Sequence, residues 1–224
     1  MPGCESVGPE DLDGLGRAAE EARYLLDRGY PKDSAILFVS NHHGLPQEQR
    51  YALTRVVLSS KSAGARKAKS VPMQALRGAD VMVDGYNVLI TAESLLAGRP
   101  VYLCDDGFLR DTFGIFNRYR PAEITDDALA AIFDLLVAAA PARIAFLLDQ
   151  QMSRSGELAA RIRALMADRQ LPGTACTARD ADHRLKTFAG IVASADGSVI
   201  DAATIVVDIP AKIARARGIS TLCI

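Results

Sequence analysis

The chain has 224 residues, of which 49% are hydrophobic and 24% charged, and its formal net charge is −1. This composition is typical of a soluble globular protein with one large or two small domains, and it excludes a polyanion, a polycation and a chain disordered by self-repulsion. No apolar run approaches the ~18 residues of a membrane span, and the acidic first residues lack the apolar stretch of a secretory signal. We therefore expect a cytoplasmic protein with no membrane partner.

The first third of the chain has the pattern of a small all-α domain. Apolar residues recur at helical spacing from Leu12 to Leu26, and Gly29-Tyr30-Pro31 ends that helix. A short helix begins near residue 32, and a third helix extends from Pro46 to Leu58. The predicted domain covers residues 1–60.

The second and third of these helices, joined by a short turn containing glycine, have the outline of a helix-turn-helix. The third helix would present Arg50 and Arg55, which suit contacts to the phosphates and base edges of DNA. The alternative is a helical cap that packs on the main domain. His42 and His43 fall in the turn, where we expect a structural or solvent-facing role rather than metal ligation.

Residues 61–79 are small, polar and basic, which predicts a linker. From residue 49 to 79 the chain has seven basic residues and no acidic one. The linker could become ordered on a polyanion or remain a solvated loop. Its predicted nucleic-acid-binding residues are Lys61, Arg66, Lys67 and Lys69.

From residue 80 onward, apolar strands alternate with helical stretches. The predicted strands are 81–83, 100–104, 143–148, 190–194 and 204–208, and the predicted helices are 88–97, 125–139, 155–169 and 180–188. This alternation predicts the α/β class for residues 80–224, with a parallel sheet and helices on both of its faces.

Aspartates follow several of these strands, namely Asp84, Asp105, Asp106, Asp149 and Asp196. Because the carboxyl ends of parallel strands share one edge of a sheet, we expect these side chains to converge there. Clustered carboxylates repel one another unless a cation screens them, and Mg²⁺ and Mn²⁺ prefer oxygen ligands. Asp105 and Asp106 also fit a turn, because Gly107 follows them. Asp182 could face the same edge or pair with Lys186.

The run Ser153-Arg154-Ser155-Gly156 follows the third predicted strand and begins a helix. Free amides at a helix N-terminus attract anions, and Arg154 adds positive charge, so a phosphate could bind there. The alternative is that Ser155 only caps the helix.

The sequence VDGYNVL at residues 83–89 resembles the first strand of the PIN and NYN nuclease superfamily, and VASADGSVID at 192–201 resembles a segment near the end of those domains. The order of Asp84, Asp149, Asp182 and Asp196 is similar to the acidic quartet of that superfamily. The whole chain also resembles an uncharacterised prokaryotic family that joins a helical segment to a PIN-like domain. The segments that carry this second resemblance are RYLLDRGYPKDSA, DGYNVLITAESLLAGRPVYLCDDGFLRD and LLDQQMSRSGELA.

The resemblance implies a PIN-like fold and metal-dependent hydrolysis of RNA. Asp84 and Asp196 would bind Mg²⁺ or Mn²⁺, and Asp149 or Asp182 would complete the metal site or orient the attacking water. Asn87 would orient Asp84 or contact a phosphate. The DDG of residues 105–107 and the SRSG of residues 153–156 depart from the superfamily pattern.

Three functions are compatible with these features. The first is a ribonuclease whose substrate is guided by the basic stretch 49–79. The second is a nucleic-acid-binding regulator with a non-catalytic PIN-like domain, and the third is a Mg²⁺-dependent phosphoryl-transfer enzyme that acts on a small phosphate ester. A homo-oligomer is compatible with each of them.

Overall fold

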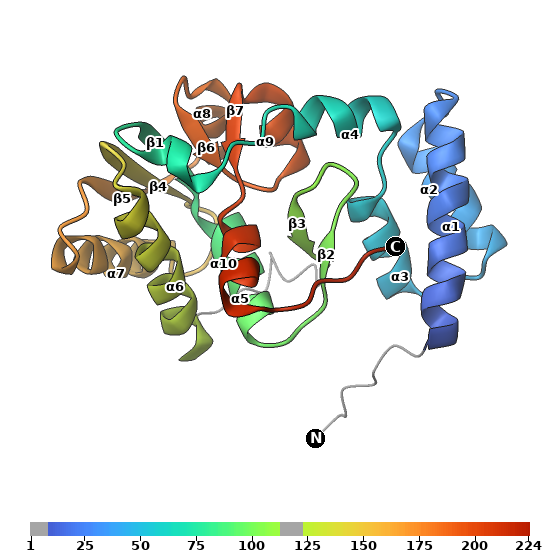
Figure 1. Cartoon of the computed structure of the whole chain (residues 1–224), viewed down its shortest axis with the longest axis horizontal. Coiled ribbons are helices and arrows are strands. Elements are labelled where there is room, and N and C mark those ends of the chain that lie inside the picture. The colour runs from blue at the N-terminus through green and yellow to red at the C-terminus, as the bar shows by residue number, and fades with distance from the viewer. Residues whose placement is uncertain (1–8, 113–122) are drawn as a thin grey trace.

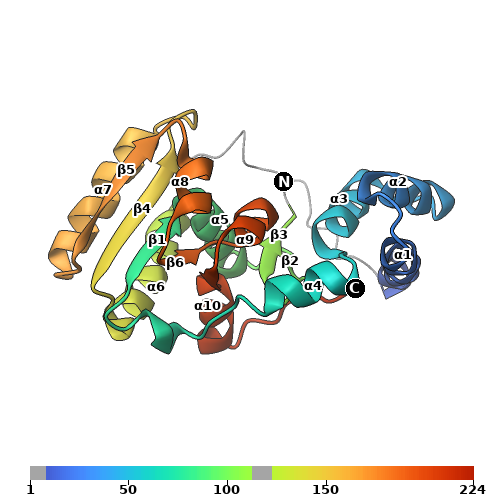
Figure 2. The ribbon, with the colours of Figure 1, turned by 90° about the horizontal axis from the view of Figure 1, so that it is seen from above.

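The computed structural model describes residues 9–112 and 123–224, with side chains from residue 14 onward. Its first helices are α1 (Pro9–Asp27), α2 (Lys32–His42), α3 (Gln47–Val56), α4 (Ser60–Lys67) and the 3-10 helix η1 (Met73–Leu76). The strands are β1 (Asp80–Asp84), β2 (Val101–Leu103), β3 (Leu109–Asp111), β4 (Arg143–Asp149), β5 (Gly173–Ala178), β6 (Ile191–Ala193) and β7 (Ile205–Val207). The remaining helices are α5 (Gly85–Leu96), α6 (Glu123–Ala139), α7 (Ser155–Asp168), α8 (Ala181–Thr187), α9 (Gly197–Ala202) and α10 (Ile209–Arg217). Figures 1 and 2 show their arrangement.

A five-stranded parallel sheet forms the centre of the α/β part, with the strand order β5-β4-β1-β6-β7. In register, Val83 of β1 pairs with Phe146 of β4 on one side and Ala193 of β6 on the other. The chain runs outward from β1 to β4 and β5, and then returns to the opposite side of β1 with β6 and β7. The strand order therefore reverses at β1, and a parallel sheet typically binds its ligands at the carboxyl end of such a reversal point.

Alternation along the strands divides the core into two layers. Val83 and Phe146 pack with residues of α5, α6, α7 and α10 on one face of the sheet. Leu147 and Val192, which point the other way, pack with residues of α8 and α9. The α/β class, with a parallel sheet and helices on both faces, is therefore confirmed.

An N-terminal helical segment, made of α1, α2 and α3, precedes the sheet, as predicted. Its core contains Leu15, Val39 and Leu53, and it extends to Tyr102 and Cys104 at β2. In both ribbon views the β2–β3 pair lies between this segment and the sheet (Figures 1 and 2). None of the helices in the described ranges is both long and apolar enough to span a membrane.

One predicted strand of the sheet was assigned wrongly. The strand predicted at 100–104 is β2, which pairs antiparallel with β3 in a separate two-stranded sheet. The fifth parallel strand is instead β5, with the sequence GTACTA, which pairs with β4. Small and polar residues make β5 a weak strand signal, whereas the apolar run of β2 packs against helices rather than into the parallel sheet.

The segment predicted as a linker has defined structure in part. Residues 60–67 form α4, and the side chain of Ser59 caps this helix by accepting a hydrogen bond from the Ser62 amide. Farther on, the Val71 amide donates to Val206 O, and the Val206 amide donates to Lys69 O. The chain therefore runs beside β7 before it enters β1.

Candidate functional site

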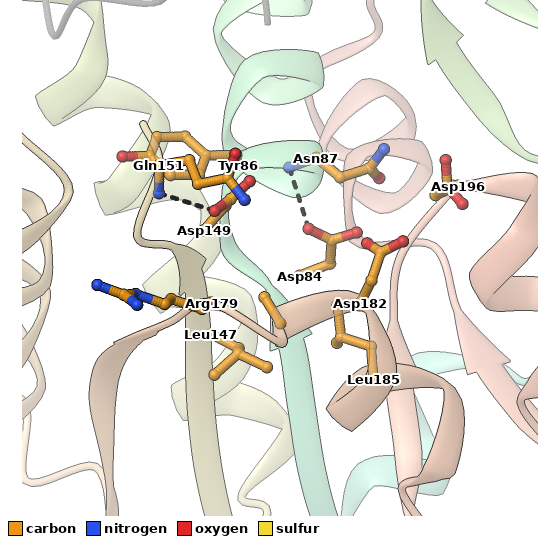
Figure 3. Close-up of a pocket in the computed structure, with 11 residues that line it drawn as sticks. Asp84, Tyr86, Asn87, Leu147, Asp149, Gln151, Arg179, Asp182, Leu185 and Asp196 are labelled. Carbon is orange, nitrogen blue, oxygen red and sulfur yellow. Dashed lines mark hydrogen bonds between the residues drawn. The ribbon is translucent and has the colours of Figure 1, made fainter. Parts of the chain in front are cut away.

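A pocket of about 320 Å³ lies at the carboxyl edge of the parallel sheet, beside the end of β1 (Figure 3). All four predicted catalytic acids line it, namely Asp84, Asp149, Asp182 and Asp196, together with the predicted supporting residue Asn87. The acids come from the ends of β1 and β4, from α8, and from the turn between β6 and α9. The structure thus brings together residues that are far apart in the sequence, because parallel strands place their carboxyl ends at one edge.

Asp84 is the last residue of β1 and the N-cap of α5. One of its oxygens accepts a hydrogen bond from the backbone amide of Asn87 at 3.4 Å, and the other accepts one from the hydroxyl of Ser194 at 2.8 Å. Gly85 allows α5 to start close to β4, because a Cβ at this position would lie 2.5 Å from Leu148 Cδ2 and 3.0 Å from Leu147 O. The Asp-Gly pair of the motif is therefore explained by a cap and a close contact between helix and strand.

The pKa of Asp84 is raised from 3.8 to about 7. Burial is the largest cause, and the negative charges of Asp196 and Asp182 add to it, while the hydrogen bond from Ser194 opposes it. The carboxylates of Asp84 and Asp182 point toward one another in Figure 3. A proton or a cation would relieve this repulsion, so Asp84 has the electrostatic surroundings of a cation-binding carboxylate.

Asn87 and Ser194 hold the ends of β1 and β6 together. The side-chain oxygen of Asn87 accepts the amide of Ala195 at 2.8 Å, and the hydroxyl of Ser194 accepts the amide of Asp196 at 3.0 Å. Asn87 therefore orients Asp84 only through its backbone amide, while its side chain positions the turn that carries Asp196.

Asp196 is the N-cap of α9. Its Oδ1 accepts hydrogen bonds from the Ser198 amide at 2.8 Å, the Ser198 hydroxyl at 2.6 Å and the Val199 amide at 3.1 Å. Burial acts to raise its pKa, but these hydrogen bonds, assisted by the positive charge of Arg55, leave it lowered overall. Asp196 is therefore ionised at neutral pH, and its charge contributes to the raised pKa of Asp84.

The other two acids are less constrained. Asp149, at the end of β4, accepts the amide of Gln151 at 2.8 Å. Asp182, in the first turn of α8, has a side chain that is 76% exposed and lies 3.2 Å from Lys186 Nζ. The structure shows both arrangements expected for Asp182, because its side chain lines the pocket at the sheet edge and also pairs with Lys186.

The spacing of these carboxylates limits how they could bind a metal. Within the described ranges, no three of the four acids have ligand oxygens that all lie within 4.8 Å of one another. Mg²⁺ is usually bound by only one or two carboxylates and keeps several waters. The donor set therefore fits a hydrated ion on Asp84 and one neighbouring acid better than an ion enclosed by all four.

The predicted supporting acids Asp105 and Asp106 lie away from this pocket, because β2 does not belong to the parallel sheet. The Asp105 carboxylate accepts hydrogen bonds from Arg23 Nη2 at 2.7 Å and from the backbone amide of Leu58 at 2.9 Å. Asp106 is fully buried and lies 2.6 Å from Arg110 and 3.3 Å from Arg66. Both acids join the β2–β3 pair to neighbouring elements, so the structure does not bring them to the pocket with the other predicted acids.

The predicted anion-binding run after β4 also lies outside the residues that line the pocket. Arg154 is the N-cap of α7, has a φ of 62°, and forms an ion pair with Glu157 at 2.7 Å. Ser155 is the first residue of the helix and is buried, so it does not cap the helix, and Ser153 is exposed. The positive charge of Arg154, which was predicted to attract a phosphate, is therefore paired with the carboxylate of Glu157.

The predicted nucleic-acid-binding residues divide into two groups. Arg50 donates to Leu45 O and Asn41 Oδ1, so it supports the turn between α2 and α3. Arg66 pairs with Asp201 at 2.7 Å, and Lys69 donates to the backbone oxygens of Ile200 and Asp201, so both attach α4 and the following segment to α9. The second group consists of Lys61 and Lys67, which are exposed, and Arg55, which acts electrostatically on Asp196.

The pocket contains residues that sequence reasoning did not single out, chiefly Tyr86, Gln151 and Arg179. Arg179 is exposed and directly follows β5. Recognition of β5 as a strand would have placed Arg179 at the same edge as the aspartates. Ser194, which binds Asp84, follows β6 and precedes Asp196 by two residues, so its place in the sequence was the available signal.

Comparisons with known proteins place this arrangement in a family. Residues 14–69 match a family described as a protein of unknown function, DUF434, and residues 73–212 match one described as a domain of unknown function, DUF5616. An uncharacterized protein of Methanocaldococcus jannaschii is 33% identical over 200 residues, which cover 88% of this chain and 95% of the relative. No solved structure matches the chain. The chain therefore belongs to the DUF5616 family, with an N-terminal region similar to DUF434.

Proposed function

We propose that this protein is a metal-dependent ribonuclease whose acidic pocket hydrolyses phosphodiester bonds. The observation that carries the proposal is the convergence of Asp84, Asp149, Asp182 and Asp196 at the point where the strand order reverses. The resemblance of residues 83–89 and 192–201 to PIN and NYN nucleases supports the same conclusion.

The chemistry of the donors suits Mg²⁺ or Mn²⁺. Asp84, together with Asp196 or Asp149, would hold the ion, because these groups are oxygen donors and the surroundings of Asp84 favour a cation. When bound, the ion supplies charge for the phosphate oxygens and lowers the pKa of a water. The same carboxylates would repel a polyanionic substrate without the ion.

The remaining residues of the pocket have roles in positioning and proton transfer. Ser194 and the Asn87 amide hold Asp84 in one orientation. Asp149 or Asp182 would accept a proton from the attacking water, since neither belongs to the hydrogen-bonded group around Asp196. Arg179, exposed at the pocket, would contact a phosphate of the substrate.

Cleavage of labelled single-stranded RNA with Mn²⁺, compared with EDTA, tests the proposal. The informative variant is Asp84→Asn, and Asp80→Asn is its matched control, because Asp80 occupies the opposite end of the same strand and pairs with Arg143 on the surface. We expect metal-dependent cleavage that falls at least ~100-fold in Asp84→Asn and persists in Asp80→Asn.

Three outcomes would contradict the ribonuclease. Equal activity in the two variants would exclude the acidic pocket as the active site. Cleavage of bis-p-nitrophenyl phosphate, with intact RNA, would favour an enzyme of small phosphate esters. DNA binding that is lost in Arg55→Ala, with no cleavage of any substrate, would favour a regulator.

A further inference from the structure

A second cluster of metal-ligating side chains lies in the N-terminal helical segment, away from the acidic pocket. One ligand atom from each of Glu21, His42 and His43 can be chosen so that all three lie within 4.8 Å of one another. Within the described ranges, this is the one group of three or more His, Cys, Asp or Glu side chains that meets this distance. The geometric signal for a metal is therefore stronger here than among the aspartates.

The backbone explains how two adjacent histidines reach the same point. His42 is the last residue of α2, and His43 is its C-cap, with φ −87° and ψ 1°. The His43 amide still donates to Val39 O at 3.0 Å, and the chain then turns through Gly44 at φ 59°. His43 thus extends the helix end toward Glu21 on α1 while His42 stays on the helix.

The two imidazole rings lie edge to face. Their centroids lie 5.0 Å apart with the planes at 85°, so one edge faces the other ring. The ring of His42 is also parallel to that of Phe38, with centroids 6.4 Å apart and an interplanar angle of 3°. Both rings therefore lie against a neighbouring aromatic ring.

His43 carries the most informative atom of the cluster. Its Nε2 is buried and makes no hydrogen bond, yet it lies 3.0 Å from Glu21 Oε2. The Glu21 carboxylate is therefore the partner of this nitrogen, at the distance of an ion pair. A cation bound by both atoms would take the place of the proton between them.

The ligand types and the distance agree with a transition metal. Two imidazoles and one carboxylate form a ligand set that Zn²⁺ accepts, whereas Mg²⁺ prefers oxygen donors alone. With metal–ligand distances of about 2.0–2.1 Å, two ligands of a tetrahedral ion are separated by about 3.3 Å. The His43–Glu21 separation of 3.0 Å therefore requires only a small adjustment.

We propose that Glu21, His42 and His43 bind Zn²⁺ and that the ion links α1 to the end of α2. This site would give the two histidines a role other than the structural or solvent-facing one expected from the sequence. Since this cluster shares no residue with the acidic pocket, the proposal does not depend on nuclease activity.

The three histidines of the chain make the test direct. Zn²⁺ is titrated into the metal-free full-length protein in competition with a chromophoric chelator, and the imidazole signals are followed by NMR. We expect the first, tightest equivalent of Zn²⁺ to shift the imidazole signals of His42 and His43 and not that of His183, which lies exposed on α8. The melting temperature should rise with Zn²⁺, because the ion binds the folded chain.

The informative variants are His42→Ala and Glu21→Gln, since both residues are exposed and their substitution should leave the helical core folded. Each should weaken Zn²⁺ binding at least ~10-fold, because loss of a direct ligand exceeds the effect of an outer hydrogen-bond partner. His183→Ala is the control and should bind this first equivalent as the native chain does. Weak binding by the native chain, or weakening in the control but not in His42→Ala, would overturn the proposal.

Discussion

Two groups of aspartates follow apolar strands in this chain and have opposite surroundings. At the end of β2, Asp105 and Asp106 meet arginines, and Asp106 is fully buried between Arg110 and Arg66. At the end of β1, Asp84 meets a serine hydroxyl and two further carboxylates, which help to raise its pKa to about 7. The two groups have similar sequence patterns, but two arginines compensate Asp106, whereas the charges that act on Asp84 are those of other carboxylates.

The difference shows what separates a structural acid from a candidate site. A compensated buried carboxylate is part of the packing, and its removal leaves an arginine without a partner. An uncompensated carboxylate in a pocket retains the capacity to bind a cation, at a cost to the stability of the fold. Position after a strand is therefore not sufficient evidence for a site, and the charges around the carboxylate decide its role.

The strongest test of this comparison is Asp106→Ala. This change leaves Arg110, which is 3% exposed, without its carboxylate partner. We expect the free energy of unfolding to fall by about 3–5 kcal/mol, measured by urea denaturation. A loss below about 1 kcal/mol would show that the buried ion pair does not stabilise the β2–β3 region.

A smaller effect is expected from Gly85→Ala, which disturbs the position of the acidic pocket rather than its charge. The added Cβ would contact Leu148 and the carbonyl of Leu147, so α5 must move away from β4. We expect a loss of about 1–3 kcal/mol in the free energy of unfolding and weaker Mn²⁺ binding. Gly98→Ala is not a matched control because Gly98 has a positive φ, so Gly64→Ala, with open space around it, serves instead.

Asp84→Asn should increase the free energy of unfolding rather than lower it, and the size of this increase should depend on pH. Because the folded-state pKa of about 7 exceeds the ordinary 3.8, the folded chain binds more protons between these values and loses stability as pH rises through this range. The amide removes the charged form, so at pH 8 and without metal we expect Asp84→Asn to be more stable by on the order of 1 kcal/mol. The difference should vanish near pH 4.

The conclusion that Asp84 is an uncompensated carboxylate would be contradicted if Asp84→Asn lowered the free energy of unfolding by the same amount at pH 8 and pH 4. Such a result would mean that Asp84 acts mainly as a neutral hydrogen-bond partner of Ser194. Thermal denaturation at the two pH values, with Asp80→Asn as the surface control, distinguishes these cases.

The smallest effect is expected from Asp182→Asn. Its side chain is largely exposed and pairs only with Lys186 within one helix, so the free energy of unfolding should change by less than about 0.5 kcal/mol. The same substitution should lower the pKa of Asp84, because one of the like charges that raise it is removed. NMR titration of the Asp84 carboxyl measures this shift, and an unchanged pKa would remove Asp182 from the electrostatics of the pocket.

Much of the local structure could be predicted from sequence patterns. The apolar spacing of the first helices, the runs that became β1, β4, β6 and β7, and the aspartate after β1 all depend on residues close together in the chain. The convergence of Asp84, Asp149 and Asp196 followed from one general property of parallel sheets, once their strands were recognised. β5 was missed because its sequence, GTACTA, is stabilised by its neighbour β4 rather than by an apolar run of its own.

By itself, the sequence determined where β1, β4, β6, β7 and the larger helices form and which carboxylates end these strands, because these features depend on neighbouring residues. Only the tertiary structure decided that β2 pairs with β3 outside the parallel sheet and that Asp106 meets Arg66, 40 positions away. It also brought Glu21 on α1 to His43 at the end of α2. Strand partners and charge compensation depend on contacts between distant parts of the chain, and no local pattern records them.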